Sequence, residues 1–68
     1  MELLTVKEVA KRLKVSVRQV WKLNASGQMP KSVRVARSVR WRAADVAAWI
    51  GMGCPLRAEF EANREARA

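Results

Sequence analysis

Histidine is absent from this sequence and cysteine occurs once, as Cys54. Without histidine there is no histidine triad and no imidazole metal ligand, and one thiol cannot close an intramolecular disulfide or a CxxC site. The three glycines, Gly27, Gly51 and Gly53, are too scattered for a phosphate-binding loop. We therefore expect no metal, no cofactor and no enzymatic activity.

Long apolar runs are missing as well. No stretch approaches the roughly 18 residues of a membrane span. The opening residues, MELLTVKEVA, lack the basic and apolar regions of a signal peptide. With the single cysteine, these features lead us to expect a cytoplasmic protein with no membrane partner. A chain of 68 residues has room for one domain with a modest core.

Acidic side chains are scarce. The sequence has 14 Lys and Arg residues against 6 Asp and Glu residues, a formal net charge of +8 at pH 7. The excess lies in residues 1–50, which hold eleven basic and three acidic side chains, whereas residues 51–68 are neutral overall. A compact basic domain attracts polyanions, of which nucleic acid is the first candidate and an anionic membrane surface the second.

Two capped helices are predicted near the N-terminus. Thr5 and Glu8 form a T-x-x-E capping box before a helix over residues 6–13. Ser16 and Gln19 form a second box, S-x-x-Q, before a helix over residues 17–25 that ends at Gly27. The apolar positions that repeat at helical spacing and should face the core are Val6, Val9, Ala10 and Leu13 in the first helix, and Val20 and Leu23 in the second.

Only Lys14 and Val15 separate these helices, so the helices must cross steeply, as in a helix-turn-helix. Ala10 is small enough for close approach of the second helix, and Val15 is expected to plug the turn. Lys14 stands where many such motifs carry a glycine in the left-handed conformation.

A basic hairpin is predicted from KSVRVARSVRWR, in which apolar and polar residues alternate twice. If residues 36–38 form the loop, Val35 faces Val39, Val33 faces Trp41, and Arg34 faces Arg40, with Arg37 at the tip. Like charges directly across a ladder are unfavourable, so this register favours an anion bound to the hairpin.

A third helix is expected over residues 43–50, with Asp45 in its first turn and Val46, Trp49 and Ile50 facing inward. We expect residues 1–51 to form the domain and residues 52–68 to form a tail. Leu56 and Phe60 lie one turn apart if the tail is helical, and such a helix would dock on the domain or on a partner.

The order of these pieces resembles the small winged-helix proteins of the MerR-like superfamily, specifically the AlpA-type phage regulators and excisionases. The matching stretches are LTVKEVAKRLKVSVRQVWKL, GQMPKSVRV and VRWRAADVAAWI, which cover about residues 3 to 50. The resemblance implies a mainly α fold with a small β-hairpin: a winged helix-turn-helix of three helices and a two-stranded wing, with the C-terminal helix left open.

The same resemblance implies double-stranded DNA as the partner, with the second helix in the major groove and the hairpin in the adjacent minor groove. It implies a prophage or mobile-element setting, as a transcriptional regulator or a DNA-bending excisionase. An integrase, RNA polymerase or a second copy of the chain on DNA would be a further partner. The residues that it assigns to DNA are Ser16, Arg18, Gln19 and Lys22 in the helix and Arg34, Arg37 and Arg40 in the wing, and we add Lys14, Lys31 and Arg42 as phosphate contacts.

The chemistry of the helix residues suits DNA. Arg18 can grip guanine O6 and N7, Gln19 can grip adenine N6 and N7, and Lys22 can bind a phosphate or guanine. Three other readings remain open: a solvated polar face, a DNA-packaging domain like that of a terminase small subunit, and a basic module that binds an acidic protein.

Overall fold

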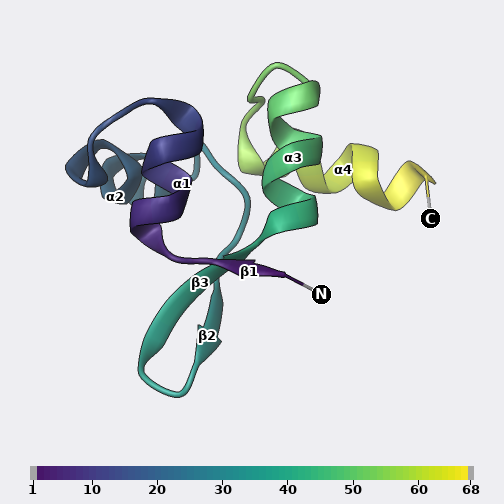
Figure 1. Cartoon of the computed structure of the whole chain (residues 1–68). Helices are drawn as coiled ribbons and strands as arrows, with labels where there is room; N and C mark the ends of the chain where they lie inside the picture. The colour runs from purple at the N-terminus through teal and green to yellow at the C-terminus, as the bar shows by residue number, and fades with distance from the viewer. Residues whose placement is uncertain (1, 68) are drawn as a thin grey trace.

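Four helices and a small antiparallel sheet make up the fold (Figure 1). The computed structural model describes residues 2–67, with the side chains of residues 2–63. The elements, in chain order, are β1 (Leu3–Leu4), α1 (Val6–Leu13), α2 (Val17–Ala25), β2 (Val33–Val35), β3 (Ser38–Arg42), α3 (Ala43–Gly51) and α4 (Arg57–Arg67). The predicted winged helix-turn-helix is confirmed. No helix in the described part of the chain is long and apolar enough to cross a membrane.

The helices begin where the sequence predicts. At α1 the capping box is complete: the Thr5 N–H donates to Glu8 Oε1 at 2.9 Å, and the Glu8 N–H donates to Thr5 Oγ1 at 3.1 Å. At α2 the Gln19 N–H donates to Ser16 Oγ at 3.1 Å, and this is the half of the second box that forms among the described residues. Both caps satisfy amide groups that have no partner inside the helix.

Helices α1 and α2 end in the same way. After α2 the Gln28 N–H donates to Leu23 O at 2.9 Å and Gly27 has a φ of 72°. After α1 the Val15 N–H donates to Ala10 O at 3.0 Å, but the left-handed residue is Lys14, with a φ of 57°. These are the bonds of a Schellman motif, and they fix the sharp turn between α1 and α2. Lys14 thus adopts the conformation that glycine takes in many such motifs.

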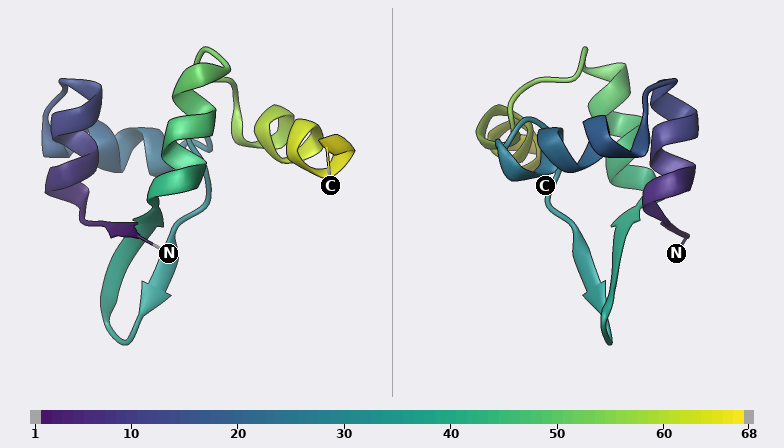
Figure 2. Two further views of the ribbon diagram at one scale, coloured as in Figure 1. Left: turned by 45° about the vertical axis from the view of Figure 1, so that its right-hand side comes forward. Right: turned by 90° about the vertical axis from the view of Figure 1, so that its left-hand side faces the viewer.

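The sheet has one more strand than the sequence predicts. Its order is β1-β3-β2, and Leu4 of β1 lies opposite Trp41 of β3. The Ala43 N–H also donates to Glu2 O at 2.9 Å, which ties the start of the chain to the start of α3. Strands β2 and β3 form a hairpin, called the wing below, that projects beyond the helices in each view (Figures 1 and 2).

The predicted register of the wing is wrong by one residue. The turn contains Ala36 and Arg37 alone, so that Val35 pairs with Ser38, Arg34 with Val39, and Val33 with Arg40. Ala36 has a positive φ of 56° and Arg37 does not, which is the pattern of a type II′ turn that matches the twist of paired strands. Directly paired residues share a face, so Arg34 and Arg40 lie on opposite faces and do not confront each other.

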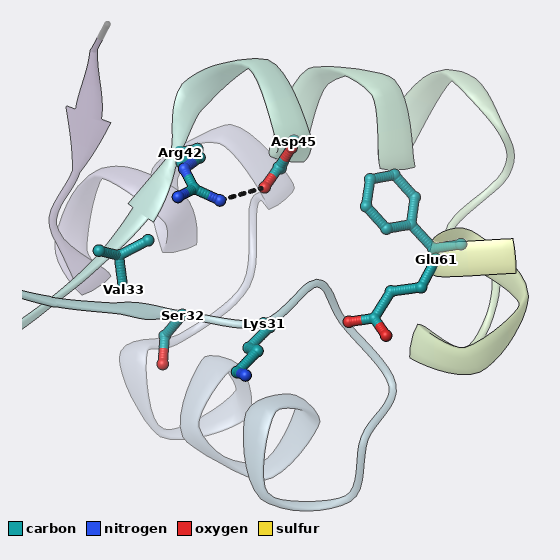
Figure 3. Close-up of a pocket in the computed structure, with 7 residues that line it drawn as sticks. Lys31, Ser32, Val33, Arg42, Asp45 and Glu61 are labelled. Carbon is teal, nitrogen blue, oxygen red and sulfur yellow. Dashed lines mark ion pairs between the residues drawn. The ribbon is translucent and has the colours of Figure 1, made fainter. Parts of the chain in front are cut away.

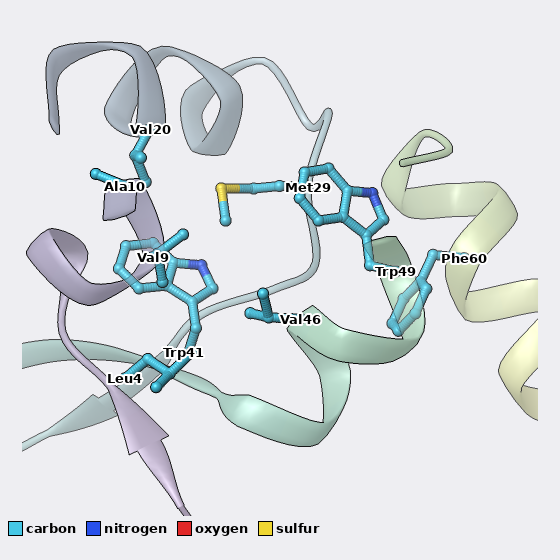
Figure 4. Packing of buried hydrophobic residues seen from close by; sticks show 9 residues of the cluster. All are labelled: Leu4, Val9, Ala10, Val20, Met29, Trp41, Val46, Trp49 and Phe60. Atoms are coloured by element: carbon cyan, nitrogen blue, oxygen red, sulfur yellow. The ribbon is translucent and has the colours of Figure 1, made fainter. Parts of the chain in front are cut away.

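The core takes side chains from every element except β2 (Figure 4). Its buried side chains are Leu4, Val9, Ala10, Val20, Met29, Trp41, Val46, Trp49 and Phe60. Val6, Leu13 and Leu23 pack against this cluster, as predicted. The inward position predicted for Trp49 is confirmed, and Trp41 is fully buried.

Three inward positions were predicted wrongly. Val35 is 47 % exposed, because the one-residue change of register turns it away from the face that carries Val39 and Trp41. Ile50 is 41 % exposed, because Val46 and Trp49 already fill the inner face of α3. Val15 is 38 % exposed, so it does not plug the turn.

The tail is helical from Arg57, and its two large apolar residues, Leu56 and Phe60, differ in burial. Phe60 is buried in the core cluster, while Leu56 is exposed. The Trp49 indole N–H donates to Pro55 O at 2.7 Å, which holds the chain as it leaves α3. The division between residues 1–51 and 52–68 stays a prediction.

Candidate nucleic-acid interface

Helix α2 has two distinct faces. Val20 is fully buried, and Val17 and Leu23 pack against the same cluster. Arg18, Gln19 and Lys22 are all exposed. Residues three and four apart lie together on a helix surface, so these three polar side chains form one patch on the side away from the core.

Ser16 and Lys14 flank the start of α2, and both are exposed. The Ser16 hydroxyl oxygen accepts from the Gln19 N–H, so this predicted contact residue is also the cap that starts the helix. The left-handed backbone at Lys14 sets the direction in which α2 leaves the turn. The start of α2 therefore carries two cations, Lys14 and Arg18, close to its free amide groups, which favour an anion.

Trp21 connects α2 to the wing. Its ring centroid lies 5.6 Å from that of Trp41, with the ring planes tilted by 54°. Tilted rings at this separation attract each other. Trp41 is fully buried, whereas Trp21 is 41 % exposed and is the neighbour of Lys22 in the α2 patch. This ring contact joins two elements that are distant in the sequence, so helical spacing alone does not indicate it.

The three wing arginines differ in environment. Arg34 and Arg37 are exposed, and Arg37 is in the two-residue turn. Arg40 is partly buried, and its Nη1 donates to Val39 O at 2.9 Å. The pKa of Glu8 in α1 is lowered chiefly by hydrogen bonds with Thr5 and then by the charge of Arg12. The charge of Arg40 makes a smaller contribution in the same direction. The wing thus presents Arg34 and Arg37 as exposed side chains, whereas Arg40 is exposed only in part.

Lys31 and Arg42 line a hollow of about 460 Å³ between the start of β2, the start of α3 and α4 (Figure 3). An Arg42 nitrogen lies 3.9 Å from Asp45 Oδ2, and Glu61 lines the same hollow. Two carboxylates therefore share this space with the two cations. The negative charges of Asp45 and Glu61 oppose the binding of an anion in this hollow.

Metal binding has little support from the side chains present. Within the described residues, no group of three or more His, Cys, Asp and Glu side chains could hold a metal ion. Cys54 is exposed and has a free thiol.

A helix-turn-helix pair with buried inner faces, an exposed polar patch on its second helix and a projecting basic hairpin define a DNA-binding protein of the winged helix-turn-helix class. A family model described as a helix-turn-helix domain matches residues 3–52, and the chain belongs to this family. No curated protein and no solved structure matches the chain significantly. The matched residues include α1, α2, the wing and α3 and exclude α4.

Proposed function

We propose that this protein binds duplex DNA in a sequence-specific manner, with α2 in the major groove and the wing in the adjacent minor groove. The observation that carries the proposal is the division of α2 into a buried face centred on Val20 and an exposed face of Arg18, Gln19 and Lys22. A solvated face would also be polar. This one offers the donors and acceptors that distinguish guanine and adenine in the major groove.

The wing supports the second contact. Arg34 and Arg37 are exposed on a hairpin that extends away from the helices (Figure 2). A narrow, A·T-rich minor groove has an enhanced negative potential that attracts an arginine inserted into it. Arg37 at the turn would enter the groove, while Arg34, the partly buried Arg40 and Lys14 would bind phosphates. Lys31 and Arg42 would make weaker phosphate contacts because Asp45 and Glu61 lie beside them.

We further propose that the protein is an AlpA- or excisionase-like member of the family, encoded by a prophage or another mobile element. It would act as a transcriptional regulator that meets RNA polymerase, or as an excisionase that bends DNA for an integrase. Self-association on DNA would accompany the second role. The resemblance of residues 3–50 to such proteins supports this proposal.

Footprinting on the DNA that flanks its own gene tests these roles. One protected site over a promoter supports a regulator, and several adjacent sites with bending support an excisionase. If about six basic side chains neutralise phosphates, log K should fall against log salt with a slope of roughly −5. Equal affinity for every duplex, with a slope shallower than about −2, would contradict the proposal and favour a module that binds an acidic protein.

A further inference from the structure

Arg57, the first residue of α4, binds the end of α2 with both its backbone and its side chain. Its N–H donates to Gly27 O at 3.0 Å, and its Nε donates to Met29 O at 2.9 Å. Its Nη2 donates to Asn24 O at 3.0 Å and lies 3.3 Å from Asn24 Oδ1. One arginine thus contacts three residues, one in the last turn of α2 and two in the linker that follows it.

These acceptors are groups that need partners. Asn24 is in the last turn of α2, where backbone carbonyls have no partner inside the helix. Gly27 and Met29 belong to the linker that leads to β2, and Met29 is fully buried. A guanidinium is a rigid planar fork that can hold two such carbonyls at once, which a lysine ammonium on its flexible stem cannot reproduce.

The core fixes α4 in turn. Phe60, three residues after Arg57, is buried in the cluster that includes Trp49 (Figure 4). The packing of Phe60 therefore fixes α4, and with it the position of Arg57 beside the end of α2. Its side chain is partly buried, and its donors are directed at protein carbonyls.

We infer that Arg57 is a positioning residue for DNA recognition: it fixes the end of α2 and the linker, and so sets the placement of the α2 patch relative to the wing. The inference rests on the proposed function. Because α4 lies outside the residues that the family model matches, it assigns α4 to the DNA-reading unit in addition to the matched domain. Since the Arg57 guanidinium donates to protein carbonyls, it should contribute to sequence discrimination and not to the salt dependence of binding.

The test compares the parent protein with Arg57→Ala and Arg57→Lys at a temperature where circular dichroism shows each variant folded. The probes are a duplex that the parent selects from a random pool and an unrelated duplex of equal length. Both variants should lose about tenfold in affinity for the selected duplex. Their affinity for the unrelated duplex and their salt slope should match those of the parent. Glu59→Gln, an exposed change on the same helix, should leave discrimination unchanged.

Amide hydrogen exchange supplies a second readout. The Ser26 and Gln28 N–H groups, which donate to Lys22 O and Leu23 O, should exchange faster in both Arg57 variants. The Val9 N–H in α1 should exchange at the parental rate. Parental discrimination in both variants overturns the inference, even if exchange is faster, because Arg57 is then only a structural contact. If Arg57→Lys alone keeps the parental affinity, the inference is also overturned, because a positive charge without the planar guanidinium is then sufficient.

Failure of the proposed function is a separate result. If the parent selects no sequence from the pool, the proposed function is wrong and the DNA part of the inference falls with it. The exchange rates still report whether Arg57 holds the end of α2. If Arg57→Ala does not fold, Arg57→Lys carries the comparison.

Discussion

Lys14 shows how much one residue controls in this fold. Its left-handed backbone, with a φ of 57° and a ψ of 42°, ends α1 and turns the chain into α2. A residue with a Cβ pays a steric cost in this conformation that glycine does not pay. The position keeps a cation at the start of α2, at the expense of some stability.

Lys14→Gly should therefore raise the free energy of unfolding by about 0.5–1 kcal/mol, since relief of strain exceeds the added entropy of glycine. The matched control is Lys11→Gly. Lys11 is exposed and lies within α1, where glycine should cost about 1 kcal/mol. Urea denaturation of the three proteins measures both changes, and a Lys14→Gly protein less stable than the parent would contradict the assignment of strain.

Ionisation of Glu8 makes the stability of the domain depend on pH. Hydrogen bonds from Thr5, together with the charges of Arg12 and Arg40, hold the pKa of Glu8 below its ordinary value of 4.5. A carboxyl whose pKa is lower in the folded state stabilises the fold above its unfolded pKa and loses that contribution as pH falls through the folded pKa.

Glu8→Gln separates the charge of Glu8 from its cap, because glutamine can still accept from the Thr5 N–H. The parent should be the more stable protein at neutral pH. Its melting temperature should approach that of the variant as pH falls below 4.5. Parallel melting curves across this range would show that Glu8 ionisation does not contribute.

At the scale of elements, α2 separates stability from recognition by face. Val20 belongs to the core, whereas Arg18 is on the exposed face. Val20→Ala should lower the free energy of unfolding by about 1–3 kcal/mol through lost burial and the cavity left behind. Arg18→Ala should leave the melting temperature nearly unchanged. Equal loss of stability in both variants, measured by thermal denaturation, would show that the two faces are misassigned.

Variants of the wing test the proposed contact with the minor groove. Arg37 is exposed in the turn, while Arg42 is paired with Asp45 beside the hollow. Arg37→Ala should weaken DNA binding, most strongly on sites with A·T-rich flanks. Arg42→Ala, which removes the same charge, should have a smaller effect. Fluorescence-anisotropy titrations compare the two, and an Arg37→Ala protein that binds like the parent would limit the wing to a structural role.

The corrected register also changes what Arg40 should do. Because Arg40 lies opposite Val33 and not opposite Arg34, Arg40→Gln relieves no like-charge pair. The gain in stability that a facing arginine pair would imply is therefore not expected. Alternation predicted the wrong register because it favours a loop of three residues, which would place the apolar residues of both strands on one face, whereas the loop has two residues and pairs apolar with polar side chains. The positive φ of Ala36 goes with the shorter loop.

At the scale of the whole molecule, local signals in the sequence predicted more than long-range ones. The caps at Thr5 and Ser16 and the end of α2 at Gly27 depend on neighbouring residues, and they form as expected. Leu4 and Met29 lie in a two-residue strand and a linker, where no periodic pattern indicates burial, and the spacing of Leu56 and Phe60 did not show which of the two is buried. Their places in the core follow from tertiary packing.

In the candidate interface, too, local features could be predicted from the sequence and long-range contacts could not. The exposure of Arg18, Gln19 and Lys22 could be read from helical periodicity, because the buried face of α2 was evident in the sequence. The contacts of Arg57 could not, because they join residues 28 to 33 positions apart in the chain. Net charge of +8 indicated a polyanionic partner but not which cations would face it.

Sequence-specific reading of DNA by α2 is the central claim, and the base preferences of the parent and Arg18→Ala test it most directly. Both proteins would be titrated against a duplex selected by the parent and against every single-base variant of that duplex. If Arg18 contacts guanine, the variant should lose about 1–3 kcal/mol on the selected duplex and relax its preference at one base pair, while its other preferences persist. A parent that selects no sequence, or a variant that binds every duplex more weakly by the same factor, would contradict the claim.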